Sequence, residues 1–425
     1  MTTFSRKQLI FGSIICTIGA FFYCYEFILR IVPGVLQNEL TVAFGNISAS
    51  TFGQISALYY FAYSPMQLPV GMLMDRYGPR RLLTLACLCC TIGSYMFSYS
   101  TSIPIAGSGR FLVGFGSAFA FVGVLTSAVN WLPPRFFSLV AGLMTTLGML
   151  GLIYGEVKIT ELASTLSLSS VLMLLVLMGL ILAVFIFLVV RDAPNGISTK
   201  RQTFTDFFRS VLQVLMSRQV WLIGFVGACL YTSLSVFGEL WGKSYLENAH
   251  HLTKENAATA ISMMFLGWAV GAPLSGYLSD HTGRRIVPLL MGAACSLVCI
   301  SIILYYPGLS FFSLNWLMFL YGLFSSVEII VFVMAKENSG ALLSGTVFAA
   351  VNMIVTLGGV IFQPLVGTLL DTFGEGRTAE GIHVYSVHDY QLALSVIPIS
   401  LVLMIATTFF LKEQRKKTRN SARTS

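Results

Sequence analysis

The stretch "GMLMDRYGPRR", from Gly71 to Arg81, recurs as "GYLSDHTGRR" from Gly276 to Arg285. In each copy an Asp follows a Gly by four residues, a second Gly follows the Asp by three, and paired arginines come next. The two aspartates are 205 positions apart in a chain of 425 residues. A second repeated stretch, "TLG" at 146–148 and again at 356–358, has an offset similar to that of the two aspartates. These repeats predict two duplicated halves, an arrangement common among membrane transporters.

Long apolar segments surround both copies of the repeat. Of all residues 56% are apolar and only 10% are charged, which is too few charges to cover the surface of a soluble protein. Twelve segments are long enough to cross ~30 Å of hydrocarbon as helices, and too continuously apolar for barrel strands. They lie at 9–30, 52–74, 82–100, 105–130, 137–155, 168–190, 219–241, 257–279, 286–306, 313–334, 341–370 and 391–411. We predict an all-α membrane protein whose twelve transmembrane helices form two pseudo-symmetric six-helix bundles.

The chain is expected to have four parts. They are an N-terminal six-helix bundle over 1–190, a cytoplasmic linker over 191–217, a C-terminal six-helix bundle over 218–411 and a basic cytoplasmic tail over 412–425. Helical spacing of the apolar residues in the linker's "FTDFFRSVLQVLM" predicts an amphipathic helix in the membrane plane. With twelve crossings, 20 of the 26 Lys and Arg fall on one side, which predicts that both termini are cytoplasmic. The net charge of +8 is then a topological signal, and we expect no nucleic-acid partner.

A third motif, "GRFLVGFGSA" from Gly109 to Ala118, joins the two loop motifs. Together they resemble the signature motifs of the major facilitator superfamily, and the resemblance covers essentially the whole chain. The stretches "YYFAYSPMQLPVGMLMDRYGPRR" and "YEFILRIVPG" also resemble a narrower branch, the phagosomal transporters of intracellular gamma-proteobacteria. The resemblance implies the two-bundle fold, a multi-pass location in the bacterial inner membrane, alternating access, and import of amino acids or nucleosides.

The loop motifs are expected to act as a gate. Asp75 and Asp280 end helices two and eight, where a carboxylate can meet a helix N-terminus or an arginine of another loop. The resemblance implies that such contacts hold the cytoplasmic side closed, and the alternative is that the charges only anchor the loops and set topology. Gly71 and Gly276 are expected to allow close helix packing. The candidate gating residues are Gly71, Asp75, Arg76, Arg80, Arg81, Arg135, Gly276, Asp280, Arg284 and Arg285.

Charged residues inside membrane helices are costly and indicate function. Glu26 and Arg30 are four residues apart, so they lie on one helical face and can pair. Other interpretations stay open for each charge: Arg30 could extend to the outer interface, Arg110 could serve helix packing, Glu239 could be solvated, and Glu328 could be paired. Tyr25, Asn352 and Gln363 are polar candidates for the cavity wall. The candidate substrate-binding residues are Tyr25, Glu26, Arg30, Arg110, Glu239, Glu328 and Asn352.

Opposite charges on the two halves suit a zwitterionic substrate. We expect Arg30 or Arg110 to meet a carboxylate, and Glu239 or Glu328 to meet an amine. Glu26 is the first candidate for proton coupling, because burial disfavours a charged carboxyl and Arg30 would sense its state.

We therefore expect a monomeric secondary active importer in the lipid bilayer, carrying an amino acid and coupled to protons. Alternatives are a nucleoside importer, a uniporter, an efflux transporter or a non-transporting sensor. Helix five carries "LGMLGLIYGE", without the Gly-Pro signature of drug antiporters in the resembled superfamily, which disfavours efflux. The sequence has no phosphate-binding loop of the G-x-x-x-x-G-K-[ST] type, so ATP-driven pumping is not expected. It shows neither a nucleophile–base pair nor a metal cluster within the membrane segments, so we expect no enzyme, no metal and no cofactor.

Overall fold

The computed structural model describes residues 6–100, 102–192, 204–338, 344–379 and 382–413, and these are almost entirely helical. The first part comprises α1 (Arg6–Val35), α2 (Gln37–Ala43), α3 (Ala49–Met66), α4 (Val70–Tyr77), α5 (Pro79–Tyr99), α6 (Ile103–Ser117), α7 (Ala120–Trp131), η1 (Pro134–Phe136), α8 (Phe137–Thr165) and α9 (Leu168–Val189). The second comprises α10 (Phe204–Leu215), α11 (Arg218–Thr232), η2 (Ser233–Trp241), α12 (Gly242–Ala249), α13 (Lys254–Thr282), α14 (Ile286–Tyr305), α15 (Phe311–Ser325), η3 (Ser326–Glu328), α16 (Ile329–Glu337), α17 (Ser344–Phe373), α18 (Val387–Leu394) and α19 (Val396–Thr408). A two-residue antiparallel pair, β1 (Thr378–Ala379) and β2 (Ile382–His383), follows α17.

The predicted membrane segments are present as helices. Within the described ranges, 11 helical stretches are long and apolar enough to cross a membrane. The remaining predicted segment, 52–74, is α3 continued by α4 after a turn at 67–69. Pro69 in that turn cannot donate a backbone hydrogen bond, so it favours an interruption of the helix there. The all-helical fold with twelve spans is thus confirmed.

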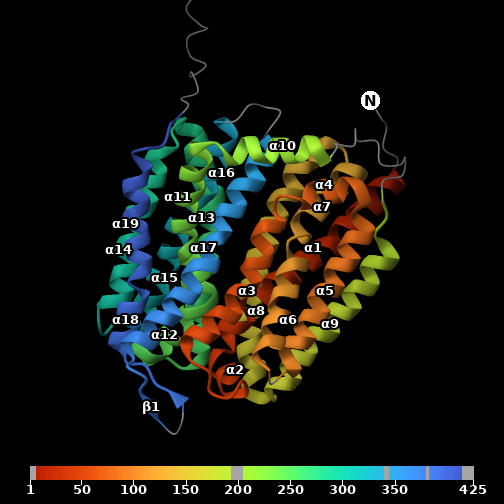
Figure 1. The fold of residues 1–425 in the computed structure, drawn as a ribbon. Helices are drawn as coiled ribbons and strands as arrows, with labels where there is room; N and C mark the ends of the chain where they lie inside the picture. The colour runs from red at the N-terminus through yellow and green to blue at the C-terminus, as the bar shows by residue number, and fades with distance from the viewer. Residues whose placement is uncertain (1–5, 101, 193–203, 339–343, 380–381, 414–425) are drawn as a thin grey trace, which may run out of the picture.

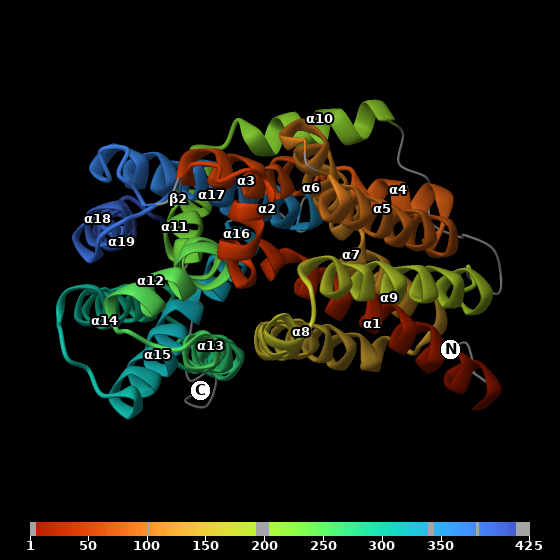
Figure 2. The same ribbon diagram turned by 90° about the horizontal axis from the view of Figure 1, so that it is seen from below.

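The spans form two groups of helices (Figure 1). Helices α1 to α9, coloured red to yellow-green, lie beside α11 to α19, coloured green to blue. Contact between the two groups runs through α3 with α17 and α8 with α13, and the neighbouring positions of α8 and α13 are clear from below (Figure 2). Residues 193–203 of the expected linker and 414–425 of the expected tail lie outside the described residues.

The amphipathic helix predicted in the linker is α10. It runs across the top of the molecule in Figure 1, at a steep angle to the bundle helices. Phe207, Val211 and Val214 are buried against the protein, whereas Phe208 and Leu212 are 62% and 63% exposed. Only part of the expected apolar face therefore packs on the helices beneath, and the rest remains free to contact lipid.

Glycines allow the two groups to approach closely. A Cβ added at Gly34 would lie 2.2 Å from the backbone oxygen of Glu239, and one at Gly367 would lie 2.3 Å from that of Ala49. Any side chain at these positions would force the helices apart. The packing role expected for Gly71 and Gly276 is wrong in this conformation, because a Cβ at either would meet no atom of the described residues within 4 Å. Gly71 instead borders the central cavity.

The two ends of the molecule differ. We call the end that carries 71–81 and 276–285 the motif side, and the opposite end the far side. On the far side, the Asp371 carboxylate of α17 accepts hydrogen bonds from the backbone N–H groups of Ala49 and Ser50, at 3.0 and 2.9 Å. These donors begin α3, where a carboxylate also complements the helix dipole. Lys254 of α13 also pairs with Glu39 of α2 at 2.5 Å. Polar contacts between the halves thus close the far side.

Candidate functional site

A cavity of about 750 Å³ lies between the two helical groups. Its walls extend from Arg30 and Tyr231 at the centre to Gly71, Asp75 and Arg76 on the motif side. Because the far side is closed and this cavity reaches the motif side, the molecule is open at one end only. That geometry is one of the two end states that alternating access requires.

Arg30 of α1 is the cation at the centre of the cavity. Its Nη2 donates to both carboxylate oxygens of Glu26, at 3.2 and 3.1 Å, which confirms that these two residues pair within one helix. Its Nε donates to the Tyr59 hydroxyl and its Nη1 to the Tyr231 hydroxyl, both at 3.1 Å. Arg30 is only 5% exposed, so the alternative in which it extends to the outer interface does not hold.

Glu239 approaches Arg30 from the other half of the chain. Its Oε1 lies 3.8 Å from Arg30 Nη1 and has no hydrogen-bond partner among the described residues, while Oε2 accepts a hydrogen bond from the Tyr60 hydroxyl. Glu239 belongs to η2, a π-helical stretch in which every residue is buried. Such stretches often occur at functional sites, because the wider turn redirects side chains. Arg30 therefore lies between two carboxylates, one from each half.

Glu328 is a carboxylate in the wall of the same cavity. It ends η3 and is 7% exposed. It has neither a hydrogen bond nor an ion pair with any described residue, so the described contacts do not support the interpretation as a buried structural pair. A buried carboxylate without a partner is costly unless a ligand cation or a proton compensates it.

Four predicted substrate-binding residues do not line this cavity: Glu26 and Glu239, which contact Arg30, and also Arg110 and Tyr25. Arg110 is buried in the first half and donates to the backbone oxygens of Leu29 at 2.9 Å and Arg30 at 3.3 Å. These bonds attach Arg110 to the backbone of α1, which agrees with the interpretation that Arg110 serves helix packing. Tyr25 also points into the first half, where its hydroxyl donates to the backbone oxygen of Leu175 at 2.9 Å. The apolar segments of the sequence placed Arg110 and Tyr25 on membrane helices, but they did not show which side of each helix faces the cavity.

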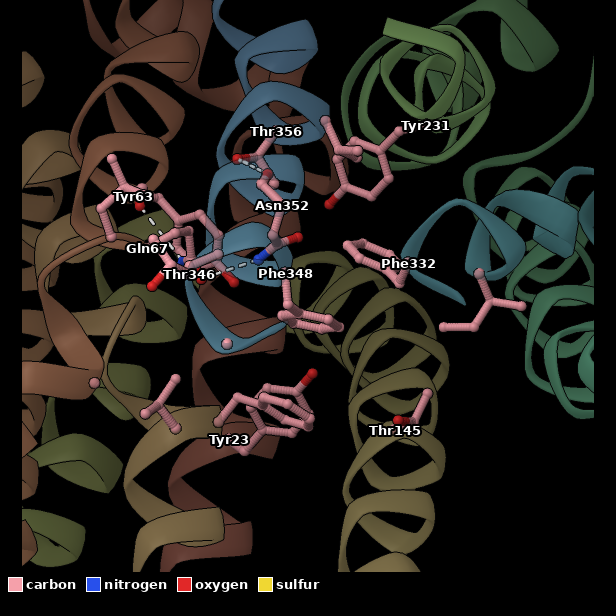
Figure 3. Close-up of a pocket in the computed structure, with 18 of the residues that line it drawn as sticks. Tyr23, Tyr63, Gln67, Thr145, Tyr231, Phe332, Thr346, Phe348, Asn352 and Thr356 are labelled. Carbon is pink, nitrogen blue, oxygen red and sulfur yellow. Dashed lines mark hydrogen bonds between the residues drawn. The ribbon is translucent and has the colours of Figure 1, made fainter. Parts of the chain in front are cut away.

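Polar side chains of the two halves meet at the cavity wall (Figure 3). Asn352 of α17 donates through Nδ2 to Oε1 of Gln67 at 2.9 Å, so the two halves meet here through side-chain amides. Gln67 in turn approaches the backbone oxygen of Tyr63, with Nε2 at 3.5 Å. Asn352, a predicted cavity residue, is therefore placed on the cavity wall. Gln363 is instead engaged with the backbone of Ser235, at 2.7 Å.

The loop motifs differ between the halves. In the second copy, Arg285 Nη2 lies 2.8 Å from Asp280 and 2.7 Å from Glu337. In the first copy, Asp75 borders the cavity and forms no ion pair among the described residues. The backbone N–H of Arg80 donates to Asp192 at 3.1 Å. The remaining gating candidates lie on the surface: Arg76 stacks over Phe204 at 4.7 Å, Arg135 lies 4.9 Å from the ring of Phe136, and Arg81 and Arg284 are exposed.

Several buried polar residues at the site were not among the predictions. Tyr59, Tyr60 and Tyr231 surround Arg30, although Tyr is common enough in membrane helices that its presence alone is a weak signal. Lys243 follows the predicted seventh segment, which ends at 241, yet it is buried and lies 4.0 Å from Glu156, which is buried as well. The available signals for this pair were an acid at the end of the predicted fifth segment and a base just after the seventh.

The fold and cavity define a class of protein: a membrane transporter with two helical bundles around a charged site that is open at one end. The sequence matches the profile of the Major Facilitator Superfamily over residues 9–363. The chain belongs to that superfamily, and it is a transporter and not an enzyme.

Individual relatives are distant. The lysosomal dipeptide transporter MFSD1 of Danio rerio is 24% identical over 372 residues, which cover 83% of this chain and 78% of that protein. A bacterial homologue of the human lysosomal transporter Spinster, solved in an inward-facing and unoccupied conformation, has a TM-score of 0.78 at 17% identity, covering 94% of this chain and 96% of that one. The nucleoside transporter NupG has a TM-score of 0.75 at 13% identity, covering 94% and 99%. These structural likenesses show the fold.

Proposed function

We propose that this transporter imports a small zwitterionic nutrient by alternating access, an amino acid or a molecule with the same two charged ends. One observation carries the proposal: Arg30 from the first half and Glu328 from the second, which has no ion pair among the described residues, line the same cavity. Arg30 would hold the carboxylate through its planar fork of donors, and Glu328 would hold the amine. A neutral solute would leave Glu328 buried without compensation.

The proposal also includes the orientation of the protein in the membrane and the role of the charged loop on the motif side. The basic residues on the motif side favour a cytoplasmic position for that side and for both termini, in a bacterial inner membrane. The present conformation would then be open to the cytoplasm, ready to release or accept substrate. Asp75 and its neighbouring arginines would stabilise the alternative state, in which the motif side is closed.

Transport by the purified chain in proteoliposomes tests this function. Uptake of radiolabelled amino acids and short peptides should exceed that of empty liposomes, and nucleosides should be carried poorly. MFSD1, named as a dipeptide transporter, supports including peptides in the panel. Uptake of nucleosides alone would contradict the zwitterion proposal in favour of the nucleoside alternative, and no flux of any solute would favour a sensor.

Glu26 is proposed to couple transport to protons. Its carboxylate is fully buried and accepts the hydrogen bonds that Arg30 Nη2 donates. Protonation would weaken that contact and release the guanidinium for a substrate carboxylate, so proton and substrate would bind together. We expect Glu26→Gln to retain substrate exchange but to lose accumulation driven by an imposed proton gradient, measured in the same proteoliposomes.

The matched control for that variant is Glu239→Gln, which alters the other carboxylate beside Arg30. Gradient-driven accumulation that survives in Glu26→Gln but disappears in Glu239→Gln would assign coupling to Glu239 instead.

A further inference from the structure

The amide bridge between Gln67 and Asn352 is only half formed. Each side-chain amide carries one acceptor and two donors, so two facing amides can make a reciprocal pair of hydrogen bonds. Here a single bond is made, from Asn352 Nδ2 to Gln67 Oε1 at 2.9 Å. Asn352 Oδ1 has no hydrogen-bond partner among the described residues, and both side chains line the cavity. The pair therefore keeps unused hydrogen-bonding capacity at the substrate cavity.

We propose that Gln67 and Asn352 form a subsite for a peptide bond, so that the transported zwitterion is a short peptide and not a single amino acid. This inference rests on the proposed function, because it takes the substrate carboxylate to be held by Arg30. The two amides come from opposite halves, Gln67 from the turn that follows α3 and Asn352 from α17, and they meet at the cavity wall (Figure 3).

The geometry of a trans peptide group fits this arrangement. Its N–H and C=O point in opposite directions, so one group can bond an amide on each side of it. The peptide oxygen would accept from one side-chain amide, and the peptide N–H would donate to the oxygen of the other. A nucleobase edge presents donor and acceptor on the same side and would engage one amide at a time. A pair divided between the halves thus favours the peptide group.

The position along the cavity is also suitable. The guanidinium of Arg30 lies 5.3 Å from the ring of Tyr63, and Gln67 follows Tyr63 by one helical turn, a rise of about 5.4 Å. In a dipeptide one Cα separates the carboxylate from the peptide group, so a carboxylate at Arg30 leaves the peptide group near the two amides. Phe332 and Phe348, with ring centroids 4.7 Å apart, also line the cavity and offer an apolar surface for a side chain.

Selectivity follows from what a single amino acid lacks. An amino acid has no neutral donor–acceptor group to insert, so the two amides would keep only their single mutual bond. A dipeptide would replace that bond with two, and it would carry its amine farther along the cavity. A site built to bond a polar group discriminates against analogues that lack it.

Binding of matched ligands to the purified full chain tests the subsite. The probes are alanyl-phenylalanine, its N-methylated peptide-bond analogue, its ester analogue and free phenylalanine, with dissociation constants measured by titration. We expect alanyl-phenylalanine to bind about tenfold more tightly than each of the other three, the effect of one hydrogen bond. In Gln67→Met and Asn352→Leu this preference should disappear, and in the control Thr145→Val, which alters another cavity residue, it should persist.

The outcomes separate this inference from the proposed function. If phenylalanine binds as tightly as the dipeptide, and its binding still requires Arg30, the peptide subsite is wrong while the zwitterion site stands. Equal binding of the dipeptide and its N-methylated and ester analogues by the unmodified chain also overturns the subsite, and that comparison does not depend on any variant folding. If none of the four probes binds, the proposed function fails together with the subsite.

Discussion

Arg30→Lys is expected to lower substrate uptake at least about a hundredfold while the protein remains folded. Lysine keeps the positive charge between Glu26 and Glu239, so neither buried acid loses its counter-charge. It cannot reproduce the planar fork that reaches Tyr59, Tyr231 and Glu26 together, nor the bidentate grip on a carboxylate. Uptake in proteoliposomes, with thermal unfolding of the same preparation, measures both parts of this prediction.

The matched control for this prediction is Arg110→Lys. Arg110 is buried to a similar degree on the neighbouring helix, but it bonds backbone oxygens and does not line the cavity. We expect uptake by this variant to stay within a few-fold of the unmodified chain. Comparable losses in both variants would mean that Arg30 acts through packing, and normal uptake in Arg30→Lys would remove the bidentate carboxylate contact from the mechanism.

Lys243→Met is expected to open the far side and to destabilise the present conformation. The ammonium of Lys243, from the second half, donates to the backbone oxygen of Val35 at 3.0 Å and to Thr160 Oγ1 at 2.6 Å, both in the first half. It is also the only cation within 4.0 Å of Glu156 among the described residues, and Glu156 Oε1 has no hydrogen bond. Removing one partner of a buried ion pair typically costs about 3–5 kcal/mol, because the other charge stays buried.

Two measurements check this second prediction. Thermal unfolding should show a clear loss of stability in Lys243→Met, and the double variant with Glu156→Gln should recover most of it, because no unpaired charge then remains. A cysteine introduced by Ser244→Cys, in a background without the eight native cysteines, should react faster with an impermeant maleimide once Lys243 is replaced, since Ser244 is buried and bonds Gln37 of the other half at 2.7 Å. Unchanged stability and labelling would show that this ion pair does not hold the far side closed.

The predicted architecture depended on local signals, and most of it was confirmed. Segment length and hydropathy located the twelve spans, most of them to within a few residues, because hydrocarbon thickness sets the length of an apolar helix. The fifth and seventh extend well beyond their predicted ends at 155 and 241, to Thr165 and Ala249. Spacing along a single helix was equally informative. It predicted that Glu26 and Arg30 would pair, and that the linker would contain the amphipathic helix α10.

The candidate site could be predicted only in part. Arg30, Glu328 and Asn352 line the cavity as expected, but Arg110 and Tyr25 face the interior of the first half. The reason is that nearly every face of a membrane helix is apolar, so the sequence pattern does not fix its rotation about its own axis.

The sequence by itself determined the class of fold, the duplication and the charges that had to be buried. Only the tertiary structure decided which of those charges meet. Arg30 and Glu239 are more than 200 positions apart, as are Val35 and Lys243, yet each pair is in contact across the two halves. The tertiary structure also decided that the motif side is open and the far side closed. Membrane spans follow from the local balance between hydrocarbon and polar groups, whereas contacts between helices depend on close packing at a few glycines such as Gly34 and Gly367, which no periodicity in the sequence specifies.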